Sequence, residues 1–333
     1  MTRPIALVTG GAGFIGSNLV ARLARDAGRD VVVCDWLGSA DEGRWRNIAK
    51  HPVADLVPPE QMFDWLARNA ADVEAVFHMG AVSSTTETDV DKIVRSNFTL
   101  SRDLWGWCAE RQRRLIYASS AATYGDGALG FDDDNDPLAL GALRPLNAYG
   151  WSKALFDLYA VRQAALGHAP PQWAGLKFFN VYGPNEAHKG SMKSVIAQIW
   201  PDVAAGRSVK LFKSYRDGVP DGGQLRDFVY VRDVVDVIEW LAARPQVSGV
   251  YNLGSGRARS FKELAEATFA AAGKPPQIGY TPMPEVIRDR YQYFTEARLE
   301  RLRAAGYEGQ FTSLEDGVGD YVRGFLAKPD PYL

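Results

Sequence analysis

Tyr149 and Lys153 are four residues apart in NAYGWSK, at the start of a helical pattern, so both side chains should lie on one face of a helix. A tyrosine with a free pKa of about 10 is a weak base at neutral pH, but a neighbouring ammonium group favours its phenolate form. Such a pair can take a proton from an alcohol. We predict that Tyr149 is the proton acceptor and that Lys153 supports it.

Two serines place hydroxyl groups at the end of a predicted strand. Ser119 and Ser120 end the apolar run RLIYASS. In a parallel α/β sheet, ligands bind beyond the carboxyl ends of the strands. We therefore expect the hydroxyl group of Ser120 to hold the substrate oxygen together with Tyr149.

The segment VTGGAGFIGS places Gly10, Gly13 and Gly16 between a predicted strand and a predicted helix. Glycines at this spacing let the backbone turn sharply and approach a pyrophosphate, whose charge meets the helix N-terminus. The segment predicts a dinucleotide cofactor.

The end of the second predicted strand bears on the choice between NAD and NADP. Asp35 is in the position that usually binds the ribose 2′-hydroxyl group, which favours NAD. Arg44 and Arg46, in the loop after it, could bind the 2′-phosphate of NADP or could be solvated surface charges. The residues alone leave both cofactors open.

Short β-branched runs alternate with longer amphipathic segments in the first half of the chain. This alternation predicts an α/β fold with a Rossmann-type, doubly wound parallel sheet, and a variable loop after the second strand. The pattern changes near residue 180 and returns at 228–258. We predict an NAD(P)-binding Rossmann domain formed by residues 1–180 and 228–258. A smaller α/β substrate-binding domain should contain residues 181–227 and 259–333.

Composition excludes several classes of partner. The 333 residues carry a formal net charge of −2 and no long basic run, so we expect neither nucleic acid nor a membrane as partner. The acidic run DDDND (132–136) is expected to be a solvated loop. Cys34 and Cys108 lie in apolar segments and should be buried thiols, and four scattered histidines do not predict a metal site. The N-terminal segment is predicted to be a strand rather than a signal peptide, which indicates a cytoplasmic protein.

The glycine loop, the strand end at Ser120 and the Tyr149–Lys153 pair together resemble the extended short-chain dehydrogenase/reductase superfamily over the whole chain. Six segments resemble one family within it, the ADP-L-glycero-D-manno-heptose 6-epimerases: SSTTE (83–87), SSAATYG (119–125), NVYGPNEAHKGSM (180–192), RDFVYV (226–231), RYQYFT (290–295) and LRAAGY (302–307). The resemblance implies an isomerase of lipopolysaccharide core precursor synthesis that acts on ADP-heptose. It also implies NADP as the preferred cofactor and an assembly of several subunits, a homo-oligomer.

The resemblance further implies which residues contact each ligand. The cofactor contacts it implies are Gly10, Gly13, Phe14, Ile15, Gly16, Asp35, Trp36, Arg44, Met79, Gly80, Ala81, Ser83, Asn97, Lys153, Val181 and Lys189. The substrate contacts it implies are Ser120, Asn180, Ser191, Gln198, Phe212, Arg226 and Tyr291.

The chain departs from the family pattern at several of these positions. Its loop DWLGSADEGRWRN is longer than usual, which keeps NAD open as the cofactor. Met79 replaces a common glutamate, and Gln198 replaces a more usual histidine. Arg226 suits a bidentate contact with a diphosphate, although it could instead pair with Asp227 or Asp233.

Lys189 has a specific use in such a reaction. An epimerase that inverts a carbon through a ketone must deliver hydride to both faces of that carbon. The ketone therefore turns over, and each orientation needs its own acid or base. We predict Tyr149 and Lys189 as these two groups, in agreement with the resemblance. The alternative is that Lys189 only binds a phosphate of the substrate.

Other uses of the fold are less compatible with these residues. A 4,6-dehydratase needs an acidic pair after the strand-end serine, where this chain has Ala121 and Ala122. A 4-epimerase stays the alternative enzyme, because one tyrosine can serve a 4-keto sugar that swings in the site. A protein that only senses a dinucleotide has no need of Ser120, Tyr149 and Lys153 together.

Overall fold

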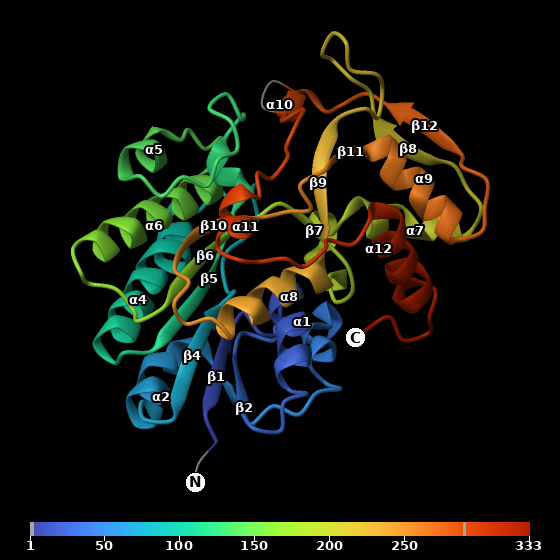
Figure 1. The fold of residues 1–333 in the computed structure, drawn as a ribbon. Coiled ribbons are helices and arrows are strands. Elements are labelled where there is room, and N and C mark those ends of the chain that lie inside the picture. The colour runs from blue at the N-terminus through green and yellow to red at the C-terminus, as the bar shows by residue number, and fades with distance from the viewer. Residues whose placement is uncertain (1–2, 289–290) are drawn as a thin grey trace.

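Figure 1 shows the fold as a computed structural model, which describes residues 3–288 and 291–333 of the chain. Arg290, the first residue of the RYQYFT segment, lies outside the described residues. Strands between residues 5 and 178, joined by β10 (Gly249–Leu253) from later in the chain, build a large sheet with flanking helices. Two small sheets, formed by other segments after residue 179, lie beside it.

The large sheet has seven strands in the order β10–β6–β5–β4–β1–β2–β3, and every neighbouring pair is parallel. The strands are β1 (Ile5–Thr9), β2 (Asp30–Cys34), β3 (Asp55–Val57), β4 (Val73–His78), β5 (Arg114–Ser120), β6 (Trp173–Phe178) and β10 (Gly249–Leu253). The strand order reverses between β1 and β4, and sheets of this kind bind ligands at such a point. The predicted Rossmann-type sheet is therefore confirmed.

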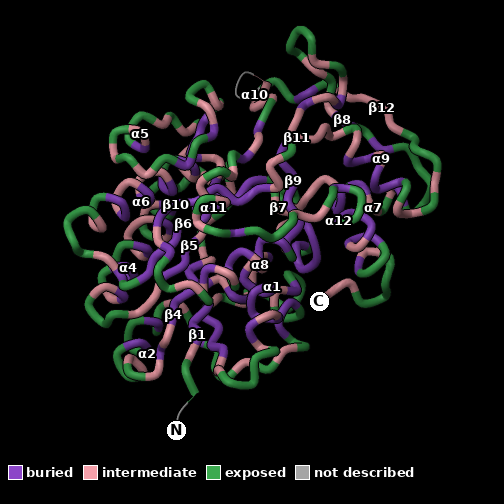
Figure 2. The backbone as a smooth tube through the Cα atoms, in the orientation of Figure 1, coloured by how far each residue is buried: buried purple, intermediate pink, exposed green. Residues whose placement is uncertain are grey.

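Helices cover both faces of this sheet. One apolar core contains residues of α1 (Phe14–Leu23), α8 (Val231–Ala242) and α11 (Glu300–Ala304). The other contains residues of α2 (Met62–Asn69), α4 (Leu100–Glu110), α5 (Pro137–Ala142) and α6 (Ala148–Ala165). Successive strand residues point to opposite faces, so Leu7 packs in one core and Val8 in the other. Figure 2 shows the strands as a mainly buried band between more exposed helices.

Short helical turns complete this part of the chain. The helix α3 (Val90–Ile93) continues through the π-helical turn η4 (Val94–Thr99) into α4, and the 3₁₀ turn η5 (Ala121–Tyr124) follows β5 directly. Both turns lie against α6, which carries the predicted tyrosine and lysine.

The two small sheets have the orders β11–β9–β7 and β12–β8. Their strands are β7 (Asn180–Tyr182), β8 (Val209–Phe212), β9 (Leu225–Tyr230), β11 (Ala258–Ser260) and β12 (Ile278–Thr281). The accompanying helical elements are η6 (Ala187–Met192), α7 (Val195–Ala204), α9 (Phe261–Ala271), α10 (Glu285–Arg288), α12 (Leu314–Tyr321) and η7 (Val322–Leu326). Of the segment 228–258, the strand β9 belongs to a small sheet, whereas α8 packs on α1 and β10 joins the large sheet. The division into two domains stays a prediction.

The prediction of a variable loop between the second strand and β4 is wrong for most of that segment. It contains the 3₁₀ turns η1 (Ala40–Glu42), η2 (Arg44–Asn47) and η3 (Pro59–Gln61), together with β3 and α2. The buried residues of α2 are Met62, Trp65 and Leu66, which repeat at helical spacing. This helix is short, so its signal extends over only two turns.

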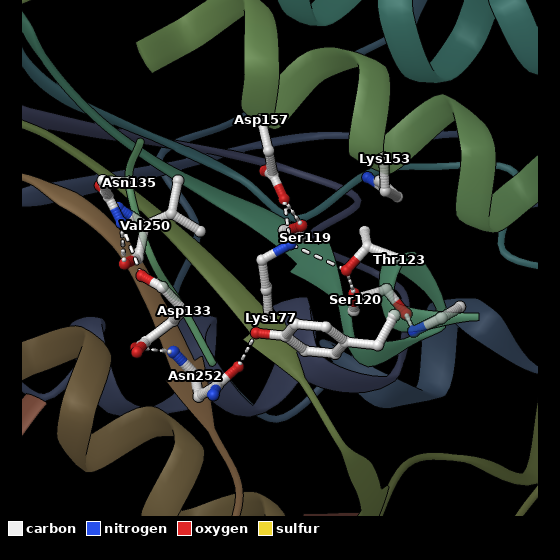
Figure 3. Close-up of polar contacts among 12 residues, drawn as sticks. Ser119, Ser120, Thr123, Asp133, Asn135, Lys153, Asp157, Lys177, Val250 and Asn252 are labelled. Atoms are coloured by element: carbon white, nitrogen blue, oxygen red, sulfur yellow. Dashed lines mark hydrogen bonds and ion pairs between the residues drawn. The ribbon is translucent and has the colours of Figure 1, made fainter. Parts of the chain in front are cut away.

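The acidic run 132–136 is only partly a solvated loop. Asp132, Asp134 and Asp136 are exposed as expected, but Asp133 is buried and accepts a hydrogen bond of 2.7 Å from the backbone N–H of Asn252. Asn135 binds both the N–H and the carbonyl oxygen of Val250 (Figure 3). Val250 and Asn252 belong to β10, the edge strand of the sheet, whose backbone groups face no further strand. The loop therefore caps this edge.

The remaining expectations from composition concern thiols, membranes and metals. Cys34 and Cys108 are buried and free, as predicted. Among residues 3–288 and 291–333, no helix is both long enough and apolar enough to cross a membrane. The same residues contain no group of three or more His, Cys, Asp or Glu arranged to hold a metal ion.

Candidate active site

The glycine loop joins β1 to α1 at the switch point of the sheet. Gly10 has a φ of 65°, and a Cβ atom on Gly16 would overlap the carbonyl oxygen of Gly10. Gly13 is the N-cap of α1 and offers no side chain to cap its first turn. The amide groups of this turn are therefore left for an anion, which meets the positive end of the helix dipole. This geometry fits the pyrophosphate of a dinucleotide.

The adenosine end of such a cofactor would meet Asp35 and Arg44. Asp35 accepts backbone hydrogen bonds from Ala12 (3.0 Å) and Trp36 (2.8 Å). Burial raises the pKa of Asp35, although these hydrogen bonds and Arg44 oppose the rise. Arg44 Nη1 lies 3.9 Å from Asp35 Oδ1, and its Nε lies 3.5 Å from the carboxylate of Glu42. A guanidinium group beside Asp35 at this place fits a ribose 2′-phosphate.

Arg46, the other arginine considered for the 2′-phosphate, stacks elsewhere. Its guanidinium carbon lies 5.4 Å from the centroid of Trp45 and 5.8 Å from that of Tyr332. Arg46 therefore belongs to an aromatic stack formed with a C-terminal residue. Arg44 remains the candidate for the phosphate contact.

Asn97 contacts the loop after β4 rather than an open pocket. Its side chain accepts a hydrogen bond from the N–H of Val82 (2.8 Å), and donates to the carbonyl of Val82 and to Ser152 Oγ (both 3.0 Å). Asn97 is fully buried in η4, whose π-helical geometry turns this side chain inward. These contacts tie Asn97 to the loop after β4. The cofactor contact predicted for Asn97 stays a prediction.

The other predicted cofactor positions surround these groups. Gly80 donates a hydrogen bond of 3.2 Å to Thr9 Oγ1, which ties the loop after β4 to the end of β1. Phe14 is buried, Ile15, Met79 and Val181 are half-buried, and Trp36, Ala81 and Ser83 are exposed.

Tyr149 and Ser120 meet at the carboxyl end of β5. Asn147 caps α6 by accepting a hydrogen bond of 2.8 Å from the N–H of Gly150, so the helix begins just before the tyrosine. A Cβ atom on Gly150 would lie 2.6 Å from the carbonyl oxygen of Ala122, and the absence of one lets α6 approach η5 closely. The hydroxyl group of Ser120 lies close enough to that of Tyr149 to lower the pKa of the tyrosine.

Lys153 lies one turn further along α6 but does not lower the pKa of Tyr149 as we expected. Its ammonium group donates a hydrogen bond of 2.7 Å to the carbonyl oxygen of Ala118, and burial lowers the pKa of Lys153 to about 8. Burial raises the pKa of Tyr149, the hydrogen bond with Ser120 lowers it, and the negative charge of Asp157 raises it. Desolvation is thus the largest influence on both groups.

Lys189 lies beside the glycine loop. It is in η6, where Gly190 adopts a φ of 56°, and its Nζ is 5.2 Å from the ring centroid of Phe14, the first residue of α1. Burial lowers the pKa of Lys189, and the carboxylate of Glu186 opposes that change. Glu186 is buried and accepts a hydrogen bond of 2.6 Å from the hydroxyl group of Ser194. Lys189 therefore carries a titratable proton next to the cofactor loop.

Arg226 lies between aromatic rings instead of pairing with an acid. Its guanidinium carbon is 5.1 Å from the ring centroid of Tyr291 and 5.7 Å from that of Phe261. Asp227 binds the backbone of residues 255, 256 and 297, and Asp233 binds Thr312, so neither carboxylate serves as its partner. The ion-pair alternative for Arg226 is therefore wrong.

The remaining predicted substrate residues are distributed around Arg226 and η6. Phe212 contacts Tyr291 edge to face at 6.4 Å between ring centroids. Gln198 donates hydrogen bonds to the carbonyl oxygens of Ser191 (3.2 Å) and Lys193 (2.8 Å), which joins α7 to the Lys189 turn. Asn180, Ser191 and Gln198 are exposed.

A buried polar cluster that the sequence did not predict lies beneath Ser120. Ser119, the other serine at this strand end, donates a hydrogen bond of 2.6 Å to Asp157 Oδ2. Asp157 also forms an ion pair of 2.8 Å with Lys177, and both side chains are fully buried (Figure 3). Two signals were present: Asp157 follows Lys153 by one helical turn, and Lys177 is a charged residue within the apolar strand GLKFF.

Comparisons with known proteins agree with this site. The model of the "NAD dependent epimerase/dehydratase family" matches residues 6–254. The ADP-L-glycero-D-manno-heptose-6-epimerase of Fusobacterium nucleatum is 48% identical, over 98% of this chain and 99% of its own. The crystal structure of the Helicobacter pylori enzyme of the same name has a TM-score of 0.78 at 29% identity, covering 98% of this chain and 97% of that one.

A structure with a bound cofactor is also similar. The UDP-glucose 4-epimerase of Thermus thermophilus, solved as a complex with NAD, has a TM-score of 0.72 at 28% identity, over 96% of this chain and 99% of its own. The family match covers the glycine loop, the Ser120 strand end, the Tyr149–Lys153 pair, Lys189 and Arg226, and the Fusobacterium relative extends the similarity to 98% of the chain. The chain therefore belongs to the NAD dependent epimerase/dehydratase family and, within it, to the ADP-L-glycero-D-manno-heptose-6-epimerases.

Proposed function

We propose that this protein converts ADP-D-glycero-β-D-manno-heptose into ADP-L-glycero-β-D-manno-heptose by inverting C6 through a transient ketone. The observation that carries the proposal is the position of Lys189 beside Phe14 and the glycine loop, on a different element from the Ser120–Tyr149 pair. Two proton-carrying groups on separate elements suit a ketone that turns over in the site. The names of the relatives support the same substrate.

When bound, a nicotinamide dinucleotide accepts a hydride from the sugar carbon and returns it to the opposite face. In one orientation, Tyr149 takes the proton of the C6 hydroxyl group while Ser120 holds the oxygen by a hydrogen bond. In the other orientation, Lys189 donates the proton that converts the ketone oxygen back into a hydroxyl group. Lys153, one helical turn from Tyr149 along α6, is proposed to contact the cofactor beside the tyrosine, while its ammonium group is held by the carbonyl oxygen of Ala118.

NADP is the cofactor we propose, with NAD as the alternative. The guanidinium group of Arg44, 3.9 Å from the carboxylate of Asp35, supports a 2′-phosphate contact. NAD stays the alternative cofactor because a similar 4-epimerase was solved as a complex with NAD. The guanidinium group would neutralise the phosphate and offset its repulsion by Asp35.

Nuclear magnetic resonance of the product mixture tests the reaction directly. Incubation with either ADP-heptose epimer should give a mixture of both C6 epimers with no net consumption of cofactor. Inversion of UDP-glucose at C4, with no change at C6 of ADP-heptose, would instead make the protein a 4-epimerase.

We also propose that the protein acts as a homo-oligomer in the cytoplasm, in the synthesis of lipopolysaccharide core precursors. Exposed apolar side chains on α5 and α6 support an assembly, because Leu138 and Trp151 are 84% and 43% exposed. Sedimentation equilibrium measures the number of subunits.

A further inference from the structure

Asp157 and Lys177 form an ion pair beneath the catalytic groups. Asp157 follows Lys153 by four residues on α6, and Lys153 follows Tyr149 by four, so all three lie along one face of the helix. Lys177 comes from β6, and its Nζ is 2.8 Å from Asp157 Oδ2. Neither side chain is exposed to solvent. We call them the Asp157–Lys177 pair.

This pair connects the elements that end at the site. Tyr117 (3.1 Å) and Ser119 (2.6 Å), both on β5, donate hydrogen bonds to the carboxylate of Asp157. Lys177 donates a hydrogen bond of 2.8 Å to Thr123 Oγ1, and Thr123 donates one of 2.9 Å to the carbonyl oxygen of Ser120 (Figure 3). The pair thus links α6, which carries the tyrosine, to the strand end that carries its serine partner.

Stability alone does not account for such a pair. Removing two charges from water is unfavourable, and apolar residues of similar volume often replace a buried ion pair with no loss of stability. Asp157 does, however, change the pKa of two neighbouring groups. Burial lowers the pKa of Lys153, and the negative charge of Asp157 opposes that change. Burial raises the pKa of Tyr149, and the same charge adds to that rise.

The other titratable groups around these residues come from four elements. Burial lowers the pKa of His78, on β4, to about 3, so it is neutral, and burial raises the pKa of Tyr117 on β5 and of Tyr124 on η5. Lys177, on β6, carries the compensating positive charge and lies 4.9 Å from the ring centroid of Tyr124. Asp157 is therefore the negative charge that acts on both catalytic groups.

We propose that the Asp157–Lys177 pair is a positioning element of the catalytic site, which fixes α6 against the ends of β5 and β6. The carboxylate of Asp157 also favours the charged form of the Lys153 ammonium group. Lys177 holds the carboxylate in place without touching the substrate. This inference rests on the proposed function only in that Tyr149 and Lys153 are the groups that handle the proton of the sugar.

The test compares a neutral pair with an ion pair at the opposite edge of the same sheet. The double variant Asp157→Asn/Lys177→Met keeps the size of both side chains and removes both charges. The control Glu74→Gln/Arg114→Met removes an ion pair at the amino ends of β4 and β5, away from the site. The variant Lys177→Arg keeps the charge at position 177.

Two measurements are made on each protein. One is the pH dependence of kcat for C6 inversion. The other is the titration of Lys153 by ¹³C nuclear magnetic resonance of protein labelled at lysine Cε, with the signal assigned by Lys153→Met. In the neutral pair, both the rate profile and the lysine titration should move to lower pH, because Asp157, and not Lys177, is the charge that raises the pKa of Lys153. The control and Lys177→Arg should show neither shift.

The outcomes separate the two proposals. A folded neutral pair with an unchanged rate profile and an unchanged Lys153 titration would overturn the positioning role. If the unaltered protein fails to invert C6, the proposed function is wrong, and the lysine titration still decides the role of the pair. If the double variant does not fold, Asp157→Asn/Lys177→Gln, which removes both charges but keeps polar side chains, is used, and the Lys153 titration must again move to lower pH.

Discussion

The side chain of Lys189 lies over the ring of Phe14, with its nitrogen 5.2 Å from the ring centroid. Phe14 is the first residue of α1, directly after the N-cap Gly13 of the cofactor loop. Lys189 therefore contacts the start of α1 from the small-sheet part of the chain, whereas Tyr149 belongs to α6. The hydroxyl group of Ser194 donates a hydrogen bond to Glu186. The negative charge of Glu186 opposes the lowering of the Lys189 pKa by burial.

Replacing Lys189 should abolish inversion without abolishing binding. We expect Lys189→Met to lower kcat for C6 inversion by about 10²–10⁴-fold, the usual contribution of a general acid or base. The dissociation constant of the ADP-sugar, measured by calorimetry, should change little. The control is Lys193→Met, which removes a lysine four residues away and should leave kcat nearly unchanged. A Lys189→Met protein that fails only through weak binding would make Lys189 a phosphate anchor.

The choice of cofactor can be tested at the two arginines after β2. Arg44→Ala should weaken NADP binding about tenfold to a hundredfold, since a charge-assisted contact contributes about 1.5–3 kcal/mol, and should leave NAD binding nearly unchanged. Arg46→Ala is the matched control, because Arg46 stacks on Trp45 and Tyr332. Fluorescence titration of both dinucleotides gives the ratio of affinities. An unchanged ratio in Arg44→Ala would assign the 2′-phosphate contact elsewhere.

The sequence predicts local features of this protein better than contacts between distant segments. The Rossmann-type sheet follows from alternating apolar runs, and the Ser120–Tyr149 contact follows from a strand end and a helix start. The Asp157–Lys177 pair was missed because it depends on how α6 packs against β6. The burial of Asp133 was missed because its partner, Asn252, is more than a hundred residues away on an edge strand.

The cap on that edge strand should contribute to stability and not to catalysis. Asn135→Ala leaves the N–H and the carbonyl of Val250 without their partner, which should lower the free energy of unfolding by about 1–3 kcal/mol. Urea unfolding measures the change, and kcat per folded molecule should remain the same. The control is Asp134→Ala, at an exposed neighbour in the same loop. Equal stability of the two variants would contradict the capping role.

His78 should make the protein sensitive to acid. It is buried at the end of β4 between Thr9 Oγ1 (2.7 Å) and Ser101 Oγ (2.8 Å), and burial lowers its pKa from 6.5 to about 3. The unfolded chain therefore binds a proton at His78 below about pH 6.5, whereas the folded chain does not until about pH 3. The stability that the neutral imidazole of His78 contributes is fully present above about pH 6.5, and it is lost as the pH falls from there towards about pH 3.

The loss attributable to His78 between pH 7.5 and pH 5 should be about 2 kcal/mol, since each pH unit below the unfolded pKa contributes about 1.4 kcal/mol. Urea unfolding of the unaltered protein and of His78→Gln at both pH values isolates this contribution, because the other histidines contribute equally to each protein. His168→Gln, at an exposed histidine, serves as the control and should retain the full acid sensitivity. If His78→Gln loses as much stability on acidification as the unaltered protein does, His78 is not the group that titrates.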